Sequence, residues 1–259
     1  MPRFAANLAF MFADRPPIER FGAAAAAGFK AVELQFPYDQ APSDIRAEIA
    51  RHGLVQLGIN TQVRPNGGEA GLGAVPGRGR EFAEVFARAL DYVAAIGGTA
   101  IHTMAGVVAP EQRPAAERAF IENYARAADL AAEKNITLLI EPLNPRDRPK
   151  YFDSRVEQAA DLVDKIGRPN LRIQFDFYHV QITSGDLLTR LEKFLPLIGH
   201  VQIAAVPSRA EPDEGEVNYP ALFDALDRLG YQGWVGCEYK PRGRTEDGLG
   251  WGRRYGLGR

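Results

Sequence analysis

Oxygen-bearing side chains end four consecutive apolar segments in the second half of the chain. The segments are ITLLIE, LRIQFD, HVQIA and WVGCE, and the side chains belong to Glu141, Asp176, Gln202 and Glu238. Successive members lie about 30 residues apart, which is roughly the length of one strand plus one helix. If the segments are neighbouring parallel strands of a barrel, the four side chains meet at one rim.

This set of side chains suits a hard divalent cation. Three carboxylates placed together repel one another, and burial disfavours their charged form unless a cation compensates them. Carboxylate and amide oxygens are the ligands preferred by Mg²⁺ and Mn²⁺. A single acid at a strand end is more often a helix cap or a solvent-facing residue, but four in register favour a Mg²⁺ or Mn²⁺ site formed by Glu141, Asp176, Gln202 and Glu238.

Eight short β-rich or apolar segments alternate with segments of helical periodicity. Within the helical segments apolar residues recur at i, i+3 and i+4, as between Phe82 and Ile96, which indicates one buried face. Glycine follows several of these segments, at Gly53, Gly98 and Gly230, where it can end a helix. The predicted strands are 4–7, 31–34, 55–60, 100–104, 137–141, 171–175, 200–203 and 234–238.

Eight strand and helix units in 259 residues predict a (β/α)₈ TIM barrel that spans residues 1–259 as a single domain. A doubly wound open sheet is the alternative. We favour the barrel because no glycine fingerprint for a dinucleotide follows the first strand, and no linker divides the chain.

Two long connections interrupt the regular alternation. Thr61 to Arg80 contains six glycines and two prolines, and Ala204 to Asn218 follows the seventh predicted strand. Both leave the C-terminal ends of strands, where barrel enzymes build their sites and where long loops often serve as lids. We therefore consider the 61–80 segment a candidate lid, with a mobile surface loop as the alternative.

The histidines near these segments differ in what they could do. His179 follows Asp176 by three residues, so we expect it just beyond the strand, near the metal without ligating it. His102 lies in the middle of a predicted strand and is either a buried core group or a substrate-binding one. His200 opens the seventh predicted strand at the opposite end of the barrel, where we expect a structural role.

Positive charge also follows the last predicted strand. Lys240 lies two residues after Glu238, so in a continuing strand both side chains point the same way. Together with Arg242 it could hold an anionic substrate, although a solvated charge pair explains the two residues equally well. Arg209, in the second long connection, is a further candidate for substrate binding. Cys237 points away from Glu238 and is expected to be a small buried hydrophobe.

Composition excludes several classes of partner. Lysine and arginine number 31 against 33 acids, so the formal charge of −2 gives no global attraction for nucleic acid. The apolar stretches are too short to span a bilayer, and the N-terminus lacks the features of a secretory signal. We expect a cytoplasmic protein that binds a small molecule rather than nucleic acid or membrane, and a homo-oligomer is compatible with the sequence.

Several longer stretches resemble the hydroxypyruvate isomerase family, which includes the 2-oxo-tetronate isomerases and belongs to the xylose-isomerase-like TIM barrels. The resemblance extends from about Arg3 to Trp251 and leaves out only the tail, residues 252–259. The stretches that carry it are FAANLAFMF, FKAVELQFPYD, GLGAVPGR, HTMAGVV and HVQIAAVPSRAEPDEGEVNYPALFDALDRLGYQGWVGCEYKPRGRTEDGLGW.

The resemblance implies a metal-dependent isomerase, an intramolecular oxidoreductase that interconverts hydroxypyruvate and 2-hydroxy-3-oxopropanoate (tartronate semialdehyde) through an enediolate. It implies that Glu141, Asp176, Gln202 and Glu238 hold the divalent metal and that Glu141 and Glu238 are the acid and base. Ketose 3-epimerases of the wider group carry histidine where this chain has Gln202. The endonucleases of the same superfamily carry a histidine-rich zinc site, which a chain with four histidines does not match.

Three alternatives remain open at this point. A 2-oxo-tetronate isomerase performs the same chemistry on a longer acid, and a ketose 3-epimerase uses the same two glutamates on a neutral sugar. The third is a barrel without activity that binds a sugar acid or a protein, which the intact Glu141 and Glu238 disfavour.

Overall fold

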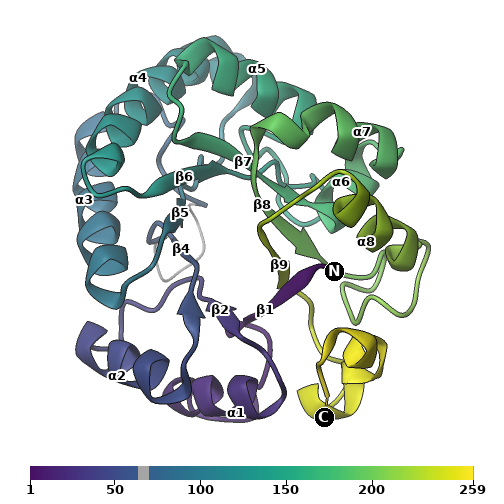
Figure 1. Cartoon of the computed structure of the whole chain (residues 1–259). Helices are drawn as coiled ribbons and strands as arrows, with labels where there is room; N and C mark the ends of the chain where they lie inside the picture. The colour runs from purple at the N-terminus through teal and green to yellow at the C-terminus, as the bar shows by residue number, and fades with distance from the viewer. Residues whose placement is uncertain (64–69, 259) are drawn as a thin grey trace.

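The computed structural model describes residues 1–63 and 70–258. Short parallel strands form one sheet in the order β3-β2-β1-β9-β8-β7-β6-β5-β4, and Figure 1 shows them around the centre of the molecule. The strands are β1 Arg3–Asn7, β2 Ala31–Glu33, β3 Val55–Gln56, β4 Gly58–Asn60, β5 Ala100–His102, β6 Thr137–Ile140, β7 Leu171–Asp176, β8 Ile198–Ile203 and β9 Trp234–Cys237.

The strands β3 and β4 are two halves of the third predicted strand, and they nearly close the barrel. β3 pairs with β2 and β4 pairs with β5. Leu57 joins them and stays in the ladder, because it donates its N–H to the Val32 carbonyl, and Leu34 donates to the Gly58 carbonyl at the start of β4. The predicted TIM barrel of one domain is thus confirmed, with one strand in two pieces.

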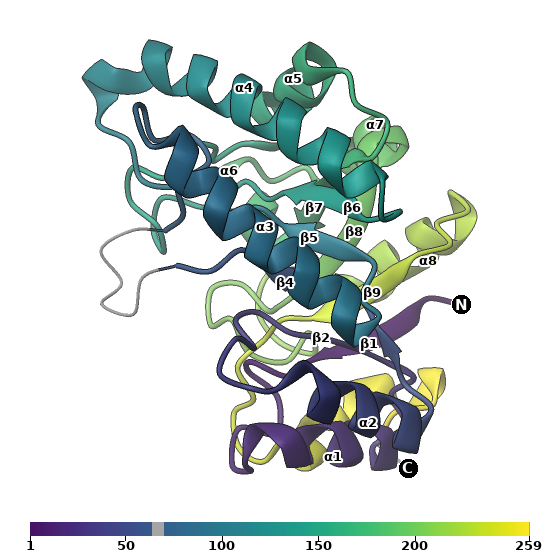
Figure 2. The same cartoon turned by 90° about the vertical axis from the view of Figure 1, so that its left-hand side faces the viewer.

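Helices surround the sheet on its outer side (Figures 1 and 2). In α3 the predicted apolar face is buried, from Phe82 to Ile96, and the helix ends at Gly97 in the left-handed conformation. The α-helices are α1 Arg20–Ala26, α2 Pro42–His52, α3 Gly79–Ile96, α4 Arg113–Ala132, α5 Val156–Ile166, α6 Phe177–Thr183, α7 Leu187–Phe194 and α8 Tyr219–Arg228. Short 3-10 helices are η1 Pro17–Glu19, η2 Pro110–Gln112, η3 Leu195–Leu197 and η4 Thr245–Tyr255.

Apolar side chains fill the space between strands and helices, and Cys237 is fully buried among them as predicted. The inside of the barrel differs, because buried polar side chains gather there instead of the branched apolar ones that usually fill it. A cavity lined by these side chains has a volume of about 210 Å³, and Asn7, Glu33, Gln174 and Gln202 contribute to it. Buried polar groups require hydrogen-bond partners, and these side chains bond to one another.

The C-terminal tail packs onto the first helix of the barrel. Leu257 is buried, and Gly258 donates its N–H to the Ala27 carbonyl. Gly28 has a φ of +98°, and a Cβ there would lie 2.3 Å from the Gly256 carbonyl oxygen, so only glycine fits this close approach. Residues 252–258 are therefore part of the folded domain.

The segment predicted as a lid, residues 61–80, is described in two parts, 61–63 and 70–80. Residues 64–69 lie outside the described residues. The part that follows them packs against the chain after β5, with Gly71 bridging to Ala105 and with Leu72 and Ala74 buried.

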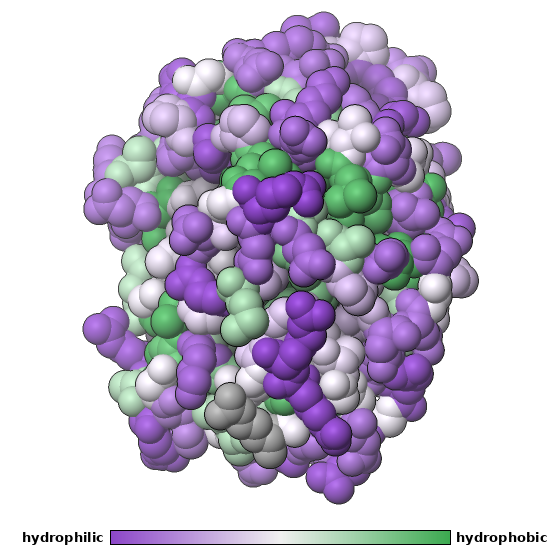
Figure 3. All heavy atoms as spheres, turned by 45° about the vertical axis from the view of Figure 1, so that its right-hand side comes forward, coloured by the Kyte–Doolittle hydropathy of each residue, from purple (hydrophilic) through white to green (hydrophobic). Residues whose placement is uncertain are grey.

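On the face drawn in Figure 3 most side chains are hydrophilic, and the apolar ones form small separate patches. Among the described residues, the helices are all too short or too polar to span a membrane.

Candidate active site

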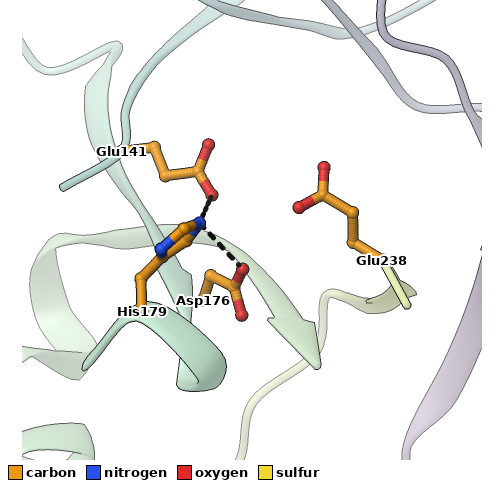
Figure 4. Close-up of side chains that lie close together, drawn as sticks. All are labelled: Glu141, Asp176, His179 and Glu238. Atoms are coloured by element: carbon orange, nitrogen blue, oxygen red, sulfur yellow. Dashed lines mark ion pairs between the residues drawn. The ribbon is translucent and has the colours of Figure 1, made fainter. Parts of the chain in front are cut away.

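Three carboxylates and one histidine converge where the strands end. Glu141 follows β6, Asp176 ends β7 and begins α6, and Glu238 follows β9. One ligand atom from each of these residues and one from His179 lie within 4.8 Å of one another. All four residues are buried, and Figure 4 shows their side chains facing a common space. Three of the four predicted metal ligands are thus close neighbours.

Glu141 and Asp176 each have one carboxylate oxygen without the partner that a buried charge needs. Glu141 Oε1 and Asp176 Oδ2 have no hydrogen-bond donor within the described part of the chain. Burial, together with the charge of Glu238, raises the pKa of Glu141 well above its usual value and that of Asp176 to about 7. A divalent cation would compensate these charges and satisfy both oxygens, so this buried Glu, Asp and His group could hold a metal.

Glu238 differs because several donors surround it. Gln35 and Arg209 each donate to it over 2.7 Å, and Asn7 donates over 3.3 Å. Burial nevertheless raises its pKa, although the Arg209 charge acts in the opposite direction. Glu238 is therefore held in one orientation by its neighbours rather than left free in the cavity.

Arg209 connects two sides of the site. It bonds to Glu238 and, over 3.3 Å, to Asp147, and its guanidinium lies over the rings of Tyr178 and Phe10. Burial works against its charge, but Glu238 and the other nearby carboxylates raise its pKa above the usual value. The loop after β8 thus brings a permanent positive charge to the acidic cluster.

The partners of His179 determine which of its nitrogens carries the proton. The backbone N–H of Asn144 donates to Nδ1 over 3.1 Å, and the Asn144 side-chain nitrogen lies 2.7 Å from the same atom. Burial, followed by the charge of Arg209, lowers the pKa of His179 well below its usual value, so the ring is neutral. A neutral ring that accepts at Nδ1 carries its proton on Nε2, which lies 3.6 Å from Asp176 and 3.9 Å from Glu141.

His102 lies at the end of β5 rather than in the middle of a strand. Its Nδ1 is 3.1 Å from Glu141 Oε2, but neither ring nitrogen makes an aligned hydrogen bond with a described residue. Burial lowers its pKa to about 3, so the ring is neutral. His102 also lines the cavity above the carboxylates, which places it in the site rather than in the apolar core.

Gln202 is the fourth predicted ligand, and its amide is bonded inside the barrel. It is level with Asp176 in the ladder between β7 and β8. Its Nε2 donates to Glu33 and its Oε1 accepts from Gln174, both over 2.7 Å. The carbonyl oxygen retains a second lone pair that could serve as a ligand.

A cavity of about 430 Å³ lies over this cluster. Lys240 and Arg148 line it, and neither forms an ion pair within the described part of the chain. Arg242 does not line the cavity, because its guanidinium lies against carboxylates of the loop after β8. These carboxylates belong to Glu211, Asp213 and Glu214.

Sequence reasoning missed several residues of the site. Asn7 and Glu33 end the first two strands in the same manner as Asp176 ends β7, so the strand-end pattern could have identified them. Asn144 and Arg148 lie in a loop, where no periodic pattern indicates which side chains turn inward.

A parallel barrel with an acidic cluster at the C-terminal ends of its strands is typical of TIM-barrel enzymes, and this is the class to which the fold and the site assign the protein. The model of the family described as Xylose isomerase-like TIM barrel matches residues 21–255. The chain belongs to this family.

Individual relatives agree with this assignment. The 2-oxo-tetronate isomerase of Cupriavidus necator is 48% identical over 261 residues and covers 100% of both chains. The hydroxypyruvate isomerase of Escherichia coli is 39% identical, over 97% of this chain and 98% of its own. The crystal structure named AP endonuclease, family 2 from Brucella melitensis has a TM-score of 0.96 and 48% identity, over 98% of this chain and 99% of its own. The predicted family and the isomerase class are confirmed.

Proposed function

We propose that the protein interconverts hydroxypyruvate and 2-hydroxy-3-oxopropanoate through an enediolate. The observation that carries the proposal is the pair Glu141 and Glu238, buried on opposite sides of one space beneath a cavity with cations in its lining. The names of the relatives from E. coli and C. necator support a short hydroxy-oxo acid as the substrate. A cytoplasmic location and any oligomeric state remain predictions.

We propose Mg²⁺ or Mn²⁺ as the cofactor, held by Glu141, Asp176, Glu238 and the amide oxygen of Gln202. The partnerless oxygens of Glu141 and Asp176 support a hard cation, and the proton on Nε2 of His179 argues against that nitrogen as a ligand. When bound, such a cation acidifies the proton next to the substrate carbonyl and stabilises the negative charge that develops on oxygen.

The two glutamates divide the proton transfer between them. One carboxylate removes a proton from C3 of hydroxypyruvate, and the electrons of the broken C–H bond form the C2–C3 double bond of the enediolate. The other glutamate delivers a proton to C2, while the hydroxyl proton at C3 passes to the C2 oxygen, so the product carries an aldehyde at C3 and a hydroxyl group at C2. A single acid or base of this kind contributes about 10²- to 10⁴-fold to the rate. His179 donates from Nε2 to a substrate oxygen and so fixes its position.

Lys240 and Arg148 are the residues that we propose hold the substrate carboxylate. Both line the cavity, and both lack an ion-pair partner within the described residues. Arg209 is already bonded to Glu238 and Asp147, so in our proposal it positions Glu238 and limits the repulsion between the acids.

Replacing Lys240 by methionine tests this carboxylate site. We expect KM for hydroxypyruvate to rise about tenfold with kcat nearly unchanged, because a charged hydrogen bond worth about 1.5 kcal/mol is lost equally from the ground and transition states. R242M is the matched control, since Arg242 lies two residues further on but outside the cavity. Steady-state kinetics with an unchanged KM for K240M, or an equal rise for R242M, would refute this role.

A comparison of three substrates distinguishes the proposed function from its alternatives. We expect turnover of hydroxypyruvate, with 2-oxo-tetronate as the closest competitor and a free ketose as a poor substrate, because a neutral sugar offers no carboxylate to Lys240. Greater kcat/KM for 2-oxo-tetronate would assign the longer acid, and preference for the ketose would assign an epimerase. A barrel that only binds would turn over none of them.

A further inference from the structure

We propose that Glu33 is a positioning residue that fixes the Gln202 amide so that its oxygen, and not its nitrogen, is available to the metal. This inference rests on the proposed metal site, of which Gln202 is one ligand. Glu33 ends β2 inside the barrel, and it is buried. It touches none of the reacting atoms in the proposed mechanism.

Three donors hold the Glu33 carboxylate. Its Oε1 accepts from Asn7 over 2.9 Å and from Gln202 over 2.7 Å. Its Oε2 lies 2.6 Å from His200 Nε2, which must be the donor because a carboxylate only accepts. All three neighbours donate to the carboxylate, and hydrogen bonds of this kind favour its ionised form.

Glycine at position 236 makes room for this carboxylate. A Cβ on Gly236 would lie 2.5 Å and 2.6 Å from the two oxygens of Glu33. β8 and β9 pair so that Gly236 lies beside Gln202. The chain thus leaves space for an acid next to the proposed ligand.

The ionised carboxylate determines the orientation of the Gln202 amide. In the observed orientation Nε2 donates to Glu33 and Oε1 accepts from Gln174. The reverse orientation would place the amide oxygen 2.7 Å from a carboxylate oxygen, and both atoms are acceptors. Glu33 therefore selects the arrangement in which the oxygen faces away from it. A neutral residue at position 33 would be compatible with either orientation of the Gln202 amide.

Binding of Mn²⁺ to the metal-free full-length protein, measured by calorimetry, tests this role without any substrate. We expect E33Q to weaken Mn²⁺ binding about 10- to 100-fold, the usual effect of removing a residue that orients a metal ligand. H200Q is the matched control, because it removes another partner of the same carboxylate but keeps the bond to Gln202. It should retain affinity close to that of the wild type.

Removing the negative charge of Glu33 weakens cation binding even if Glu33 does not orient Gln202. The substitution E33Q is therefore also made in the variant Q202A, which lacks the amide. If Glu33 acts through the Gln202 amide, E33Q adds little once that amide is absent. An equal loss in both backgrounds, or no loss in the wild-type background, overturns the inference. If E33Q does not fold, as judged by circular dichroism, the double variant E33Q/H200Q, which also replaces the histidine beside position 33, should show the same loss.

The proposed function and this inference fail in different ways. A wild-type protein that binds no Mn²⁺ would overturn the metal site and the inference together. A wild-type protein that binds Mn²⁺ as tightly as E33Q does would overturn the inference alone.

Discussion

E238Q is expected to lower kcat about 10³-fold, because an amide can neither remove nor deliver the proton that the reaction moves between two carbons. Glutamine has the size of glutamate, but it keeps an acceptor for one of two donors, because Gln35 bonds to Oε1 of Glu238 and Arg209 to Oε2. The measurement is steady-state turnover of hydroxypyruvate, with circular dichroism to verify the fold.

E211Q is the matched control for this substitution. Glu211 is another buried acid near the same end of the barrel, but its partner is Arg242 and it does not line the cavity. We expect E211Q to keep its kcat. A kcat for E238Q close to the wild-type value would exclude the role of Glu238 in acid and base catalysis.

Removal of divalent metal is expected to abolish turnover, and addition of Mn²⁺ or Mg²⁺ should restore it. Without a cation, three buried carboxylates share one space, and the charge of Arg209 offsets their repulsion in part. The substrate carbonyl then lacks the charge that stabilises the enediolate oxygen. Chelator followed by titration of each metal provides the measurement. Full activity of the chelated protein would contradict the metal site.

The same site makes the stability of the metal-free protein depend on pH. Burial, and then the charge of Glu238, raises the pKa of Asp176 to about 7, whereas an unfolded aspartate has a pKa of about 3.9. Between these values the folded state holds a proton that the unfolded state releases, so stability falls as pH rises through this window. In thermal unfolding at pH 5 and pH 7, we therefore expect Mn²⁺ to raise the unfolding temperature more at pH 7.

The barrel was predictable from sequence because the strand pattern and the helix pattern occupy separate segments of the chain. Alternating or continuous apolar runs predict strands, and the i, i+3, i+4 pattern predicts the helices that cover them. The break at Leu57 was not predictable, since Val55 to Asn60 reads as one continuous strand. The strand ends brought Glu141, Asp176 and Glu238 together as expected.

The cations of the site depend on loop paths that a pattern does not encode. Strand alternation predicted Lys240 for the site, and Arg242 was added because it lies just beyond. The side chain of Arg242 instead pairs with carboxylates of the preceding loop, outside the cavity. Arg209 reaches Glu238 from a backbone with a φ of +58°, a conformation that sequence did not indicate. Arg148 comes from the loop after β6, which carries no recognisable motif.

The depth at which a side chain lies inside the barrel also could not be predicted from the sequence. Glu33 and Gln202 each lie near the end of a strand, yet they bond to each other inside the barrel. Alternation shows that a side chain points inward but does not show the layer it occupies. His200 was expected to be structural, and its bond to Glu33 gives it that role.

Solvent deuterium incorporation tests the central claim most directly. The three substrates are incubated with the metal-loaded protein in D₂O, and label is followed by NMR at C2 of the product and C3 of recovered hydroxypyruvate. We predict deuterium at both carbons of the hydroxypyruvate pair, at a rate that E238Q lowers about 10³-fold. Turnover of hydroxypyruvate without any label would indicate a hydride shift and contradict the enediolate account.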